Sequence, residues 1–363
     1  MTPKGRRSRA LVTEAGEVRV WRAYYYCATC AAGRYPLDER WALTGSVYSP
    51  GLQRQMVWAA ARGTYAEASE MFTRLGQRTI PPTSIWAVTQ AVGADWVNRA
   101  AQAQAATPPE RVELPPAGQD HAVPKAVSLD GGMVHIRQEG WKEFKTGVVA
   151  DLRAATEPEP LDTQTETVEA ADGPHLVNPT YRAVLGDVDT FSPALWALAV
   201  EAQVPTAATV VVTADGADWI WNLADDLFPE AAQVVDWYHA TEYLARAAQA
   251  HFPTDAHAAT HWAQTHREAL FLGHTHILVT ALETAGLPTQ ADYFRRHTRR
   301  MQYQTFREDG YPIGSGAVES GIKQFKQRVA GPGMRWSRPG LERMLLLRAA
   351  LLSHTFEAQW SLN

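Results

Sequence analysis

The sequence predicts an α/β fold, and three observations carry that prediction. Two short apolar segments, 126–131 and 209–216, each end in an Asp-Gly pair and have the composition of strands. A third apolar segment, 233–236, follows a helical pattern, which gives the strand–helix–strand order of an α/β sheet. From residue 240 to 305 the apolar spacing is helical throughout. We therefore expect a partly parallel sheet combined with a long helical segment.

The composition is that of a soluble globular protein whose two ends are basic. The 363 residues carry a net charge of −5 and begin with a basic segment that lacks the apolar core of a signal peptide. There is no run of about 18 apolar residues, so no transmembrane helix is expected. Between Arg295 and Arg348 there are 12 Lys/Arg against four Asp/Glu, and residues 1–40 hold eight against four. A cytoplasmic protein that contacts a polyanion through both ends is expected, with no membrane partner.

The N-terminal segment has the pattern of a β-hairpin followed by a cysteine pair. Apolar and aromatic residues alternate over 10–26, with a turn expected at 14–17. Cys27 and Cys30 follow directly and have the spacing of one half of a zinc site. Because a structural zinc needs four ligands, Zn²⁺ is expected only if other residues complete the set. A redox-active pair is disfavoured because no βαβ unit surrounds it.

Residues 50–95 are predicted to form three helices, the third capped by Ser84. This outline is that of a helix-turn-helix, in which residues 84–90 would read DNA, although any three-helix bundle gives the same pattern. Residues 101–124 are rich in Ala, Gln and Pro, which predicts a semi-rigid linker.

The segment after the linker is expected to form a β-meander. Strands are predicted at 126–130 and 133–137, joined by a turn at Gly131 and Gly132, with a third strand at 147–151. The other elements expected are a polar loop over 154–179, helices over 193–202 and 219–228, and an apolar helix over 341–352.

A Gly/Ser turn at 310–316 leads into an amphipathic helix. Glu319 lies in its first turn, and Lys323, Lys326 and Arg328 follow. Free backbone N–H groups at a helix start favour anions. An acid beside such a turn and a row of cations suggests a carboxylate that holds a metal ion against a nucleic-acid backbone, although an ordinary amphipathic helix has the same pattern.

Three acids are expected to form the site. Asp130 and Asp215 follow strands of one α/β sheet, where binding sites are commonly built, and Glu319 begins a later helix. Such carboxylates suit two Mg²⁺ or Mn²⁺ ions, which prefer oxygen ligands and clamp both oxygens of a phosphodiester displacement. Asp-Gly alone is a common turn pair, so the prediction depends on all three residues in order.

In combination, these motifs resemble those of bacterial insertion-sequence transposases of the DDE type, of the Kra-type group and related to Mutator-like enzymes. The segments that carry the resemblance are YYYCATC at 24–30 with PLD at 36–38, SLDG at 128–131, TADGADWI at 213–220, VDWYH at 235–239, and GSGAVES at 314–320 with MRWS at 334–337. The resemblance covers nearly the whole chain. It implies an RNase H-like catalytic fold in which Asp130, Asp215 and Glu319 bind the metal ions. His239 resembles the histidine of a C/D-x-x-H motif, and is expected either to position the scissile phosphate or to be a buried structural residue.

The resemblance also implies a domain order. We expect a hairpin with half a zinc ribbon at 1–42, a helical DNA-binding domain at 43–100, a linker at 101–125, a catalytic domain at 126–239 and 311–363, and an all-helical insertion at 240–310. The family usually has a second CxxC before the hairpin. Its absence from this sequence suggests either an N-terminal truncation or a decayed ribbon.

Further DNA contacts are expected around the site. Lys323, Lys326, Arg328 and Arg335 would bind backbone phosphates, and Lys142 and Lys145 would face the substrate. Trp336 would stack on an unpaired base, or would be a core residue instead.

The predicted function is a metal-dependent DNA transposase, located in the bacterial cytoplasm with the nucleoid. It would bind the terminal repeats of its element, cleave phosphodiester bonds and join the 3′-hydroxyl ends to target DNA, as a homodimer or larger assembly on double-stranded DNA. The alternatives are an inactive or domesticated DNA-binding protein of transposase origin, and a metal-dependent nuclease without strand transfer.

Overall fold

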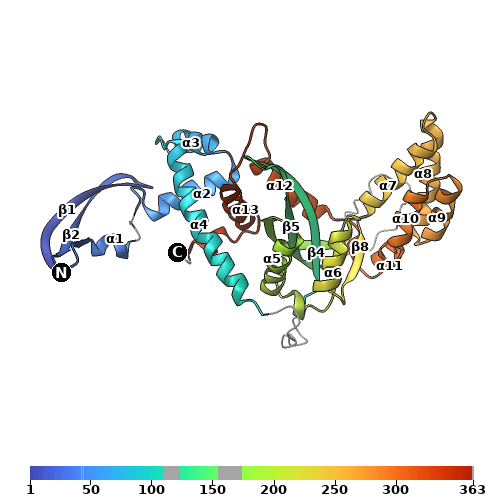
Figure 1. Ribbon diagram of the computed structural model, residues 1–363, viewed down its shortest axis with the longest axis horizontal. Coiled ribbons are helices and arrows are strands. Elements are labelled where there is room, and N and C mark those ends of the chain that lie inside the picture. Colours follow the sequence, from blue (N-terminus) through green and yellow to red (C-terminus); the bar gives the residue numbers. More distant parts are fainter. Residues whose placement is uncertain (42, 44, 109–122, 154–173, 362–363) are drawn as a thin grey trace.

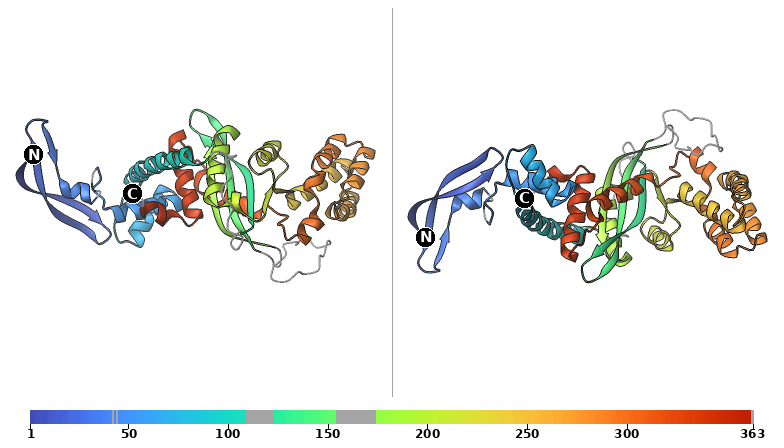
Figure 2. Two further views of the ribbon diagram at one scale, coloured as in Figure 1. Left: turned by 90° about the horizontal axis from the view of Figure 1, so that it is seen from below. Right: turned by 90° about the horizontal axis from the view of Figure 1, so that it is seen from above.

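The computed structural model describes residues 1–41, 43, 45–108, 123–153 and 174–361. The molecule is elongated, with a β-hairpin at one end, a mixed sheet in the middle and a lobe of helices at the other end (Figure 1). Two further views show the same succession from below and from above (Figure 2). No helix in the described part of the chain is long and apolar enough to cross a membrane.

The N-terminal hairpin is present, with strands longer than the alternation predicted. Its elements are β1 (Thr2–Thr13), β2 (Gly16–Cys27), β3 (Ala32–Arg34) and the short helix α1 (Pro36–Arg40). Asp38 of α1 is buried and forms ion pairs with Arg9 at 3.0 Å and with Arg22. These two pairs fix α1 against the hairpin, because a buried carboxylate is stable only when its charge is matched.

The next helices pack with the C-terminal helices of the chain in one apolar cluster. These elements are α2 (Pro50–Arg62), α3 (Tyr65–Arg74), α4 (Pro82–Ala106), α13 (Arg338–Leu352) and α14 (Phe356–Ser361). The prediction that Ser84 caps a helix is wrong: α4 already begins at Pro82, which suits a first helical position because it needs no N–H partner. Helix α4 also runs through Ala106 into the expected linker, of which residues 109–122 lie outside the described residues.

The central sheet has five strands in the order β6-β5-β4-β7-β8. Strand β4 pairs antiparallel with β5 and parallel with β7, and β8 pairs parallel with β7. The strands are β4 (Lys125–Ile136), β5 (Gly140–Arg153), β6 (His175–Leu185), β7 (Val210–Ala214) and β8 (Ala232–Val235). A mixed α/β fold, as predicted, is therefore present.

Two predictions about this sheet are wrong. Gly131 and Gly132 do not form a turn, because β4 continues through both of them. A Cβ at Gly132 would lie less than 3.0 Å from the ring of Phe144 on the paired strand, so the glycine makes room for a neighbouring side chain. The expected polar loop over 154–179 ends earlier, since residues from His175 onward form β6; residues 154–173 lie outside the described part.

Helices cover the two faces of the sheet. Helices α5 (Val188–Glu201) and α6 (Asp218–Leu227) pack on one face, with Leu129 and Ala214 beneath them. Helices α12 (Gly316–Val329) and α13 pack on the other face, against Val134 and Ile136. Because side chains alternate along a strand, even-numbered residues of β4 point to the α12 face.

The lobe of helices begins directly after β8. It consists of α7 (Trp237–His251), α8 (Ala256–Phe271), α9 (Thr275–Thr284), α10 (Pro288–Arg296) and α11 (Tyr303–Glu308), with a 3₁₀ turn at Thr298–Arg300. The helical content predicted for 240–305 is confirmed. Phe294 and Tyr303 of this lobe belong to the same apolar cluster as Val211 and Val234 of the sheet, so the lobe and the sheet share one core.

Candidate active site

Three aspartates follow the paired residues of three neighbouring parallel strands. The register aligns Leu129 of β4 with Ala214 of β7, and Ala214 with Val235 of β8. The next residue on each strand is Asp130, Asp215 or Asp236. Since neighbouring strands lie about 4.8 Å apart, the three aspartates form a row across the carboxyl end of the parallel strands.

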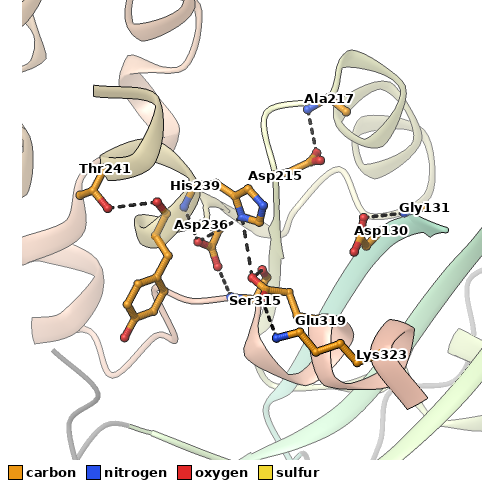
Figure 3. Close-up of polar contacts among 11 residues, drawn as sticks. Asp130, Gly131, Asp215, Ala217, Asp236, His239, Thr241, Ser315, Glu319 and Lys323 are labelled. Atoms are coloured by element: carbon orange, nitrogen blue, oxygen red, sulfur yellow. Dashed lines mark hydrogen bonds and ion pairs between the residues drawn. The ribbon is translucent and has the colours of Figure 1, made fainter. Parts of the chain in front are cut away.

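Helix α12 brings Glu319 to this row. Asp130 is an even-numbered residue of β4 and therefore points to the face that α12 covers. Glu319 lies in the first turn of α12, and its Oε1 accepts a hydrogen bond from the Ser315 hydroxyl at 3.3 Å. Figure 3 shows Asp130, Asp215, Asp236 and Glu319 around one region, with His239 between Asp236 and Glu319.

Asp236 connects three parts of the chain. Its side chain is 0% exposed, caps α7 by accepting the backbone N–H of His239 at 2.8 Å, and accepts the backbone N–H of Ser315. The Trp237 N–H donates to the carbonyl of Ile313 at 2.8 Å, which ties the same turn to α7. Burial alone would raise the pKa of Asp236, but the hydrogen bonds from His239 and Ser315 hold it below its usual value. Asp236 therefore stays ionised and fixes the start of α12.

His239 is a half-buried cation that lies between two acids. Its Nδ1 lies 3.3 Å from Asp236 Oδ1 and 3.8 Å from Glu319 Oε1. The hydrogen bond with Asp236 raises the pKa of His239 to about 9, and the charges of Asp236, Glu319 and Asp215 act in the same direction against the effect of burial. The side chain is thus an imidazolium at neutral pH, and its charge attracts the carboxylate of Glu319.

Asp130 is in an environment that disfavours its charge. Burial raises the pKa of Asp130, and the charge of Asp215 adds to this, while the Gly131 N–H, His239 and Lys326 oppose it. Asp130 Oδ1 accepts the N–H of Gly131 at 2.6 Å, and Asp215 Oδ1 accepts the N–H of Ala217 at 2.9 Å. Two adjacent, partly buried carboxylates are an arrangement that a divalent cation stabilises.

The ligand atoms of Asp236, His239 and Glu319 lie within 4.8 Å of one another, and they form the only such group of three among the described residues. The carboxylates of the predicted triad, Asp130, Asp215 and Glu319, do not form such a group. Each of them instead accepts a hydrogen bond from a residue close to it in sequence. An imidazolium is a poor metal ligand, and both Asp236 oxygens accept backbone N–H groups. The oxygen donors of Asp130, Asp215 and Glu319 fit Mg²⁺ or Mn²⁺ better.

Two of the residues predicted to contact DNA, Arg328 and Lys145, are buried in this structure, so the prediction of an exposed cation is wrong for both. Arg328 is 2% exposed, and its Nε–H donates to the carbonyl of Ala60 at 2.6 Å. Lys145 is 4% exposed, pairs with Glu143 at 2.5 Å and lies 4.2 Å over the ring of Trp219. Both side chains follow an amphipathic pattern in sequence, but packing against neighbouring elements covers them.

The other predicted contact residues are accessible. Lys142, Lys323, Lys326 and Arg335 are exposed, and Ser84 is partly exposed on the first turn of α4. Lys323 lies 3.8 Å from Glu319. Trp336 is half-buried, and its indole N–H donates to the carbonyl of Val329 at 2.8 Å, so it is fixed in place but keeps an accessible side.

Cys27 and Cys30 are free thiols at the end of the hairpin. No acid or histidine of the described residues joins them in a group of three ligand atoms. A zinc site at this position therefore stays a prediction that needs ligands from elsewhere.

The sequence motifs indicated the site but missed two residues that shape it. Ser315 bonds both Asp236 and Glu319, and only its place in the Gly/Ser turn signalled it. Tyr293 of α10 packs on the turn after Asp215, where a Cβ at Gly216 would lie less than 3.0 Å from the tyrosine ring. Nothing in the sequence near Tyr293 pointed to Asp215, because the contact exists only in the folded lobe.

Comparison with known proteins gives little further information. No family model matches the chain, and no curated protein matches it. Among solved structures, the Drosophila P element transposase strand transfer complex is similar over 89% of this chain and 83% of its own, with 9% sequence identity and a TM-score of 0.29.

Proposed function

We propose that this protein is a metal-dependent DNA transposase that cleaves phosphodiester bonds and joins 3′-hydroxyl ends to target DNA. Asp130, Asp215 and Glu319 would hold the metal ions, and double-stranded DNA would be the substrate. The single observation that carries the proposal is the register Leu129↔Ala214, which makes Asp130 and Asp215 neighbours on the face where α12 presents Glu319. The sequence motifs around these three residues support the same activity.

The residues have two roles in this proposal: some would hold the metal ions, and others position the residues that hold them. When bound, Mg²⁺ or Mn²⁺ would activate the attacking oxygen and stabilise the leaving oxygen of an in-line displacement. Asp236 holds the α12 turn through Ser315, and His239 keeps Glu319 oriented through its 3.8 Å contact. Both are positioning residues in this proposal, since neither has to touch the scissile phosphate to act.

DNA would approach across the exposed cations of α12. Lys323 and Lys326 project from the helix that carries Glu319, and Arg335 follows in the next loop. Such contacts bind phosphates without reading sequence. Recognition of the element ends is assigned to the hairpin and to helices α2–α4, and two ends would require two copies of the chain. Both assignments belong to the proposal.

The test uses a labelled duplex with a free 3′-hydroxyl end, a supercoiled target plasmid, and Mg²⁺ or Mn²⁺. Asp130→Asn, Asp215→Asn and Glu319→Gln should each remove several kcal/mol of transition-state stabilisation, which is a rate loss of about 10³-fold. Asp218→Asn is the matched control, because this exposed acid lies just after the Asp215 turn. Its rate should stay within about twofold of the parent, since a surface change of this kind is nearly neutral.

The products separate the three candidate functions. Label joined to the plasmid supports the transposase. Hydrolysis that depends on the three acids without joined products would replace it with a nuclease. If the protein binds DNA but gives neither product with Mg²⁺ or with Mn²⁺, it would be a non-catalytic DNA-binding protein.

A further inference from the structure

A cavity of about 330 Å³ lies on the α12 side of the sheet, away from the row of aspartates. It is bounded by the start of α3, the first turns of α4, the end of β4 and the loop between α12 and α13. The residues that define its chemistry are Tyr65, Trp86, Arg137, Arg328, Arg335 and Trp336.

The lining combines aromatic rings with positive charge. Three arginines line the cavity and no acidic residue does. Trp86 is 53% exposed, so its indole ring is accessible to a ligand in the cavity. Arg328 is buried between the rings of Tyr65 and Trp336, each 5.1 Å away, and its Nη2 has no hydrogen-bond partner among the described residues.

The cavity wall is fixed to the same strand that carries Asp130. The Arg137 N–H donates to the Trp336 carbonyl at 2.8 Å, and the Trp336 N–H donates to the His135 carbonyl at 3.2 Å. The loop after α12 thereby extends the sheet beside the end of β4, through an isolated bridge between Ile136 and Trp336. Trp336 and Arg137 are thus held rigidly with respect to the acidic site.

The cavity lies farther along β4 and α12 than the acids do. From Asp130 to Ile136 the strand extends six residues, which is about 20 Å. From Glu319 to Arg328 the helix extends nine residues, which is about 14 Å. The exposed Lys323 and Lys326 lie on α12 between the two sites. A strand whose scissile phosphate sits at the acids would therefore follow these lysines toward the cavity.

We propose that this cavity binds one unpaired nucleotide of the DNA substrate, with its base against Trp86 and Trp336 and its phosphate against Arg137 and Arg335. The inference rests on the proposed function, since it takes DNA as the substrate. Aromatic rings accept any base by stacking, and guanidinium groups accept phosphate oxygens in pairs.

The experiment measures stacking directly and without catalysis. The probe is a single-stranded DNA oligonucleotide with one 2-aminopurine, whose fluorescence falls when the base stacks, titrated with the full chain in EDTA. We expect quenching on binding, and Trp86→Ala should weaken affinity about 5- to 100-fold, as loss of one stacked base does. Because Trp86 carries no charge and is largely exposed, this variant leaves the electrostatics and the core unchanged.

Trp141→Ala is the matched control, since this exposed indole of β5 lies outside α2–α4 and does not line the cavity. It should bind and quench like the parent chain. Arg335→Ala should weaken binding as well, but should retain the quenching at saturation. Equal affinity and equal quenching in the parent and in Trp86→Ala would overturn the pocket.

The result of the 2-aminopurine titration can be separated from the result of the cleavage assay. If Trp86→Ala changes nothing while Asp130→Asn abolishes cleavage, the pocket is wrong and the proposed function stands. If Trp86→Ala removes quenching while Asp130→Asn still cleaves DNA, the nucleotide pocket stands and the catalytic assignment is wrong.

Discussion

Arg328 of α12 donates its Nε–H to the carbonyl of Ala60 in α2, at 2.6 Å and across 268 residues of sequence. Arg348 of α13 makes a parallel bond, from Nη1 to the carbonyl of Ala61 at 3.0 Å. Both guanidinium groups thus meet the carboxyl end of α2, where unpaired carbonyls and the helix dipole favour cations. The helix that carries Glu319 is in this way anchored to the N-terminal helices.

Replacing Arg328 with alanine should destabilise the protein. The carbonyl of Ala60 would lose its donor in a buried position and the packed rings would lose their neighbour, so we expect the free energy of unfolding to fall by about 2–4 kcal/mol. Urea denaturation measures this change. The exposed Arg335→Ala should stay within about 0.5 kcal/mol of the parent. Equal midpoints for Arg328→Ala and the parent would show that the contact does not stabilise the fold.

Replacing Gly216 with alanine should impair the site. The new Cβ would lie less than 3.0 Å from the ring of Tyr293, so either the Asp215 turn or α10 must move. We expect a loss of about 1–3 kcal/mol in stability, as overpacking commonly costs, and slower DNA cleavage. Gly316→Ala is the matched control, because nothing lies within 4 Å of its added Cβ at the start of α12. If both variants cleave DNA at the parent rate, Tyr293 does not hold the Asp215 turn.

Removing the exposed cation Lys326 should change the salt dependence of DNA binding. One phosphate contact contributes about 0.9 to the slope of log affinity against log salt. Lys326→Ala should therefore lower the steepness of that plot by about 0.9, measured by fluorescence anisotropy on a labelled duplex between low and moderate salt. Arg295→Ala, in the helical lobe and paired with Glu283, should leave the slope unchanged. If Lys326→Ala leaves the slope of log affinity against log salt unaltered, Lys326 does not contact a phosphate of the bound DNA.

The stability of the fold should depend on His297 between pH 4 and 6.5. Burial, together with the charges of Arg300 and Arg296, lowers the pKa of His297 to about 4, while the charge of Asp218 acts in the opposite direction. The unfolded chain binds this proton near pH 6.5, so the unfolded state holds more protons within that window. Stability present above pH 6.5 is therefore lost as the pH falls toward 4.

The variant His297→Gln isolates this contribution. Between pH 7 and pH 4.5, the parent should lose about 2 kcal/mol more of its free energy of unfolding than the variant does. Urea denaturation at both pH values measures the difference. Parallel pH curves for the two proteins would mean that His297 is protonated equally in both states.

Local patterns predicted most individual elements of this chain. The strand at 209–215, the helices of the lobe and the helix after the Gly/Ser turn all follow from apolar spacing and short-range capping, which depend on neighbouring residues. The patterns failed at Gly131-Gly132 and at Ser84. In the first case a ring from the paired strand requires glycine, and in the second a proline already begins the helix.

The amino-acid sequence by itself determined which residues the proposed chemistry is assigned to. Asp130, Asp215 and Glu319, and the DxxH segment at 236–239, stand out because their residue types and flanking glycines are readable along the chain. Only the tertiary structure decided what surrounds them. The register of β4, β7 and β8 aligns three aspartates, Ser315 joins Asp236 to α12, and Arg328 is buried against Ala60 instead of facing solvent. These relationships connect residues 21 (Ala214 and Val235) to 268 positions apart, and such contacts depend on how the elements pack, which spacing along one helix or strand does not encode.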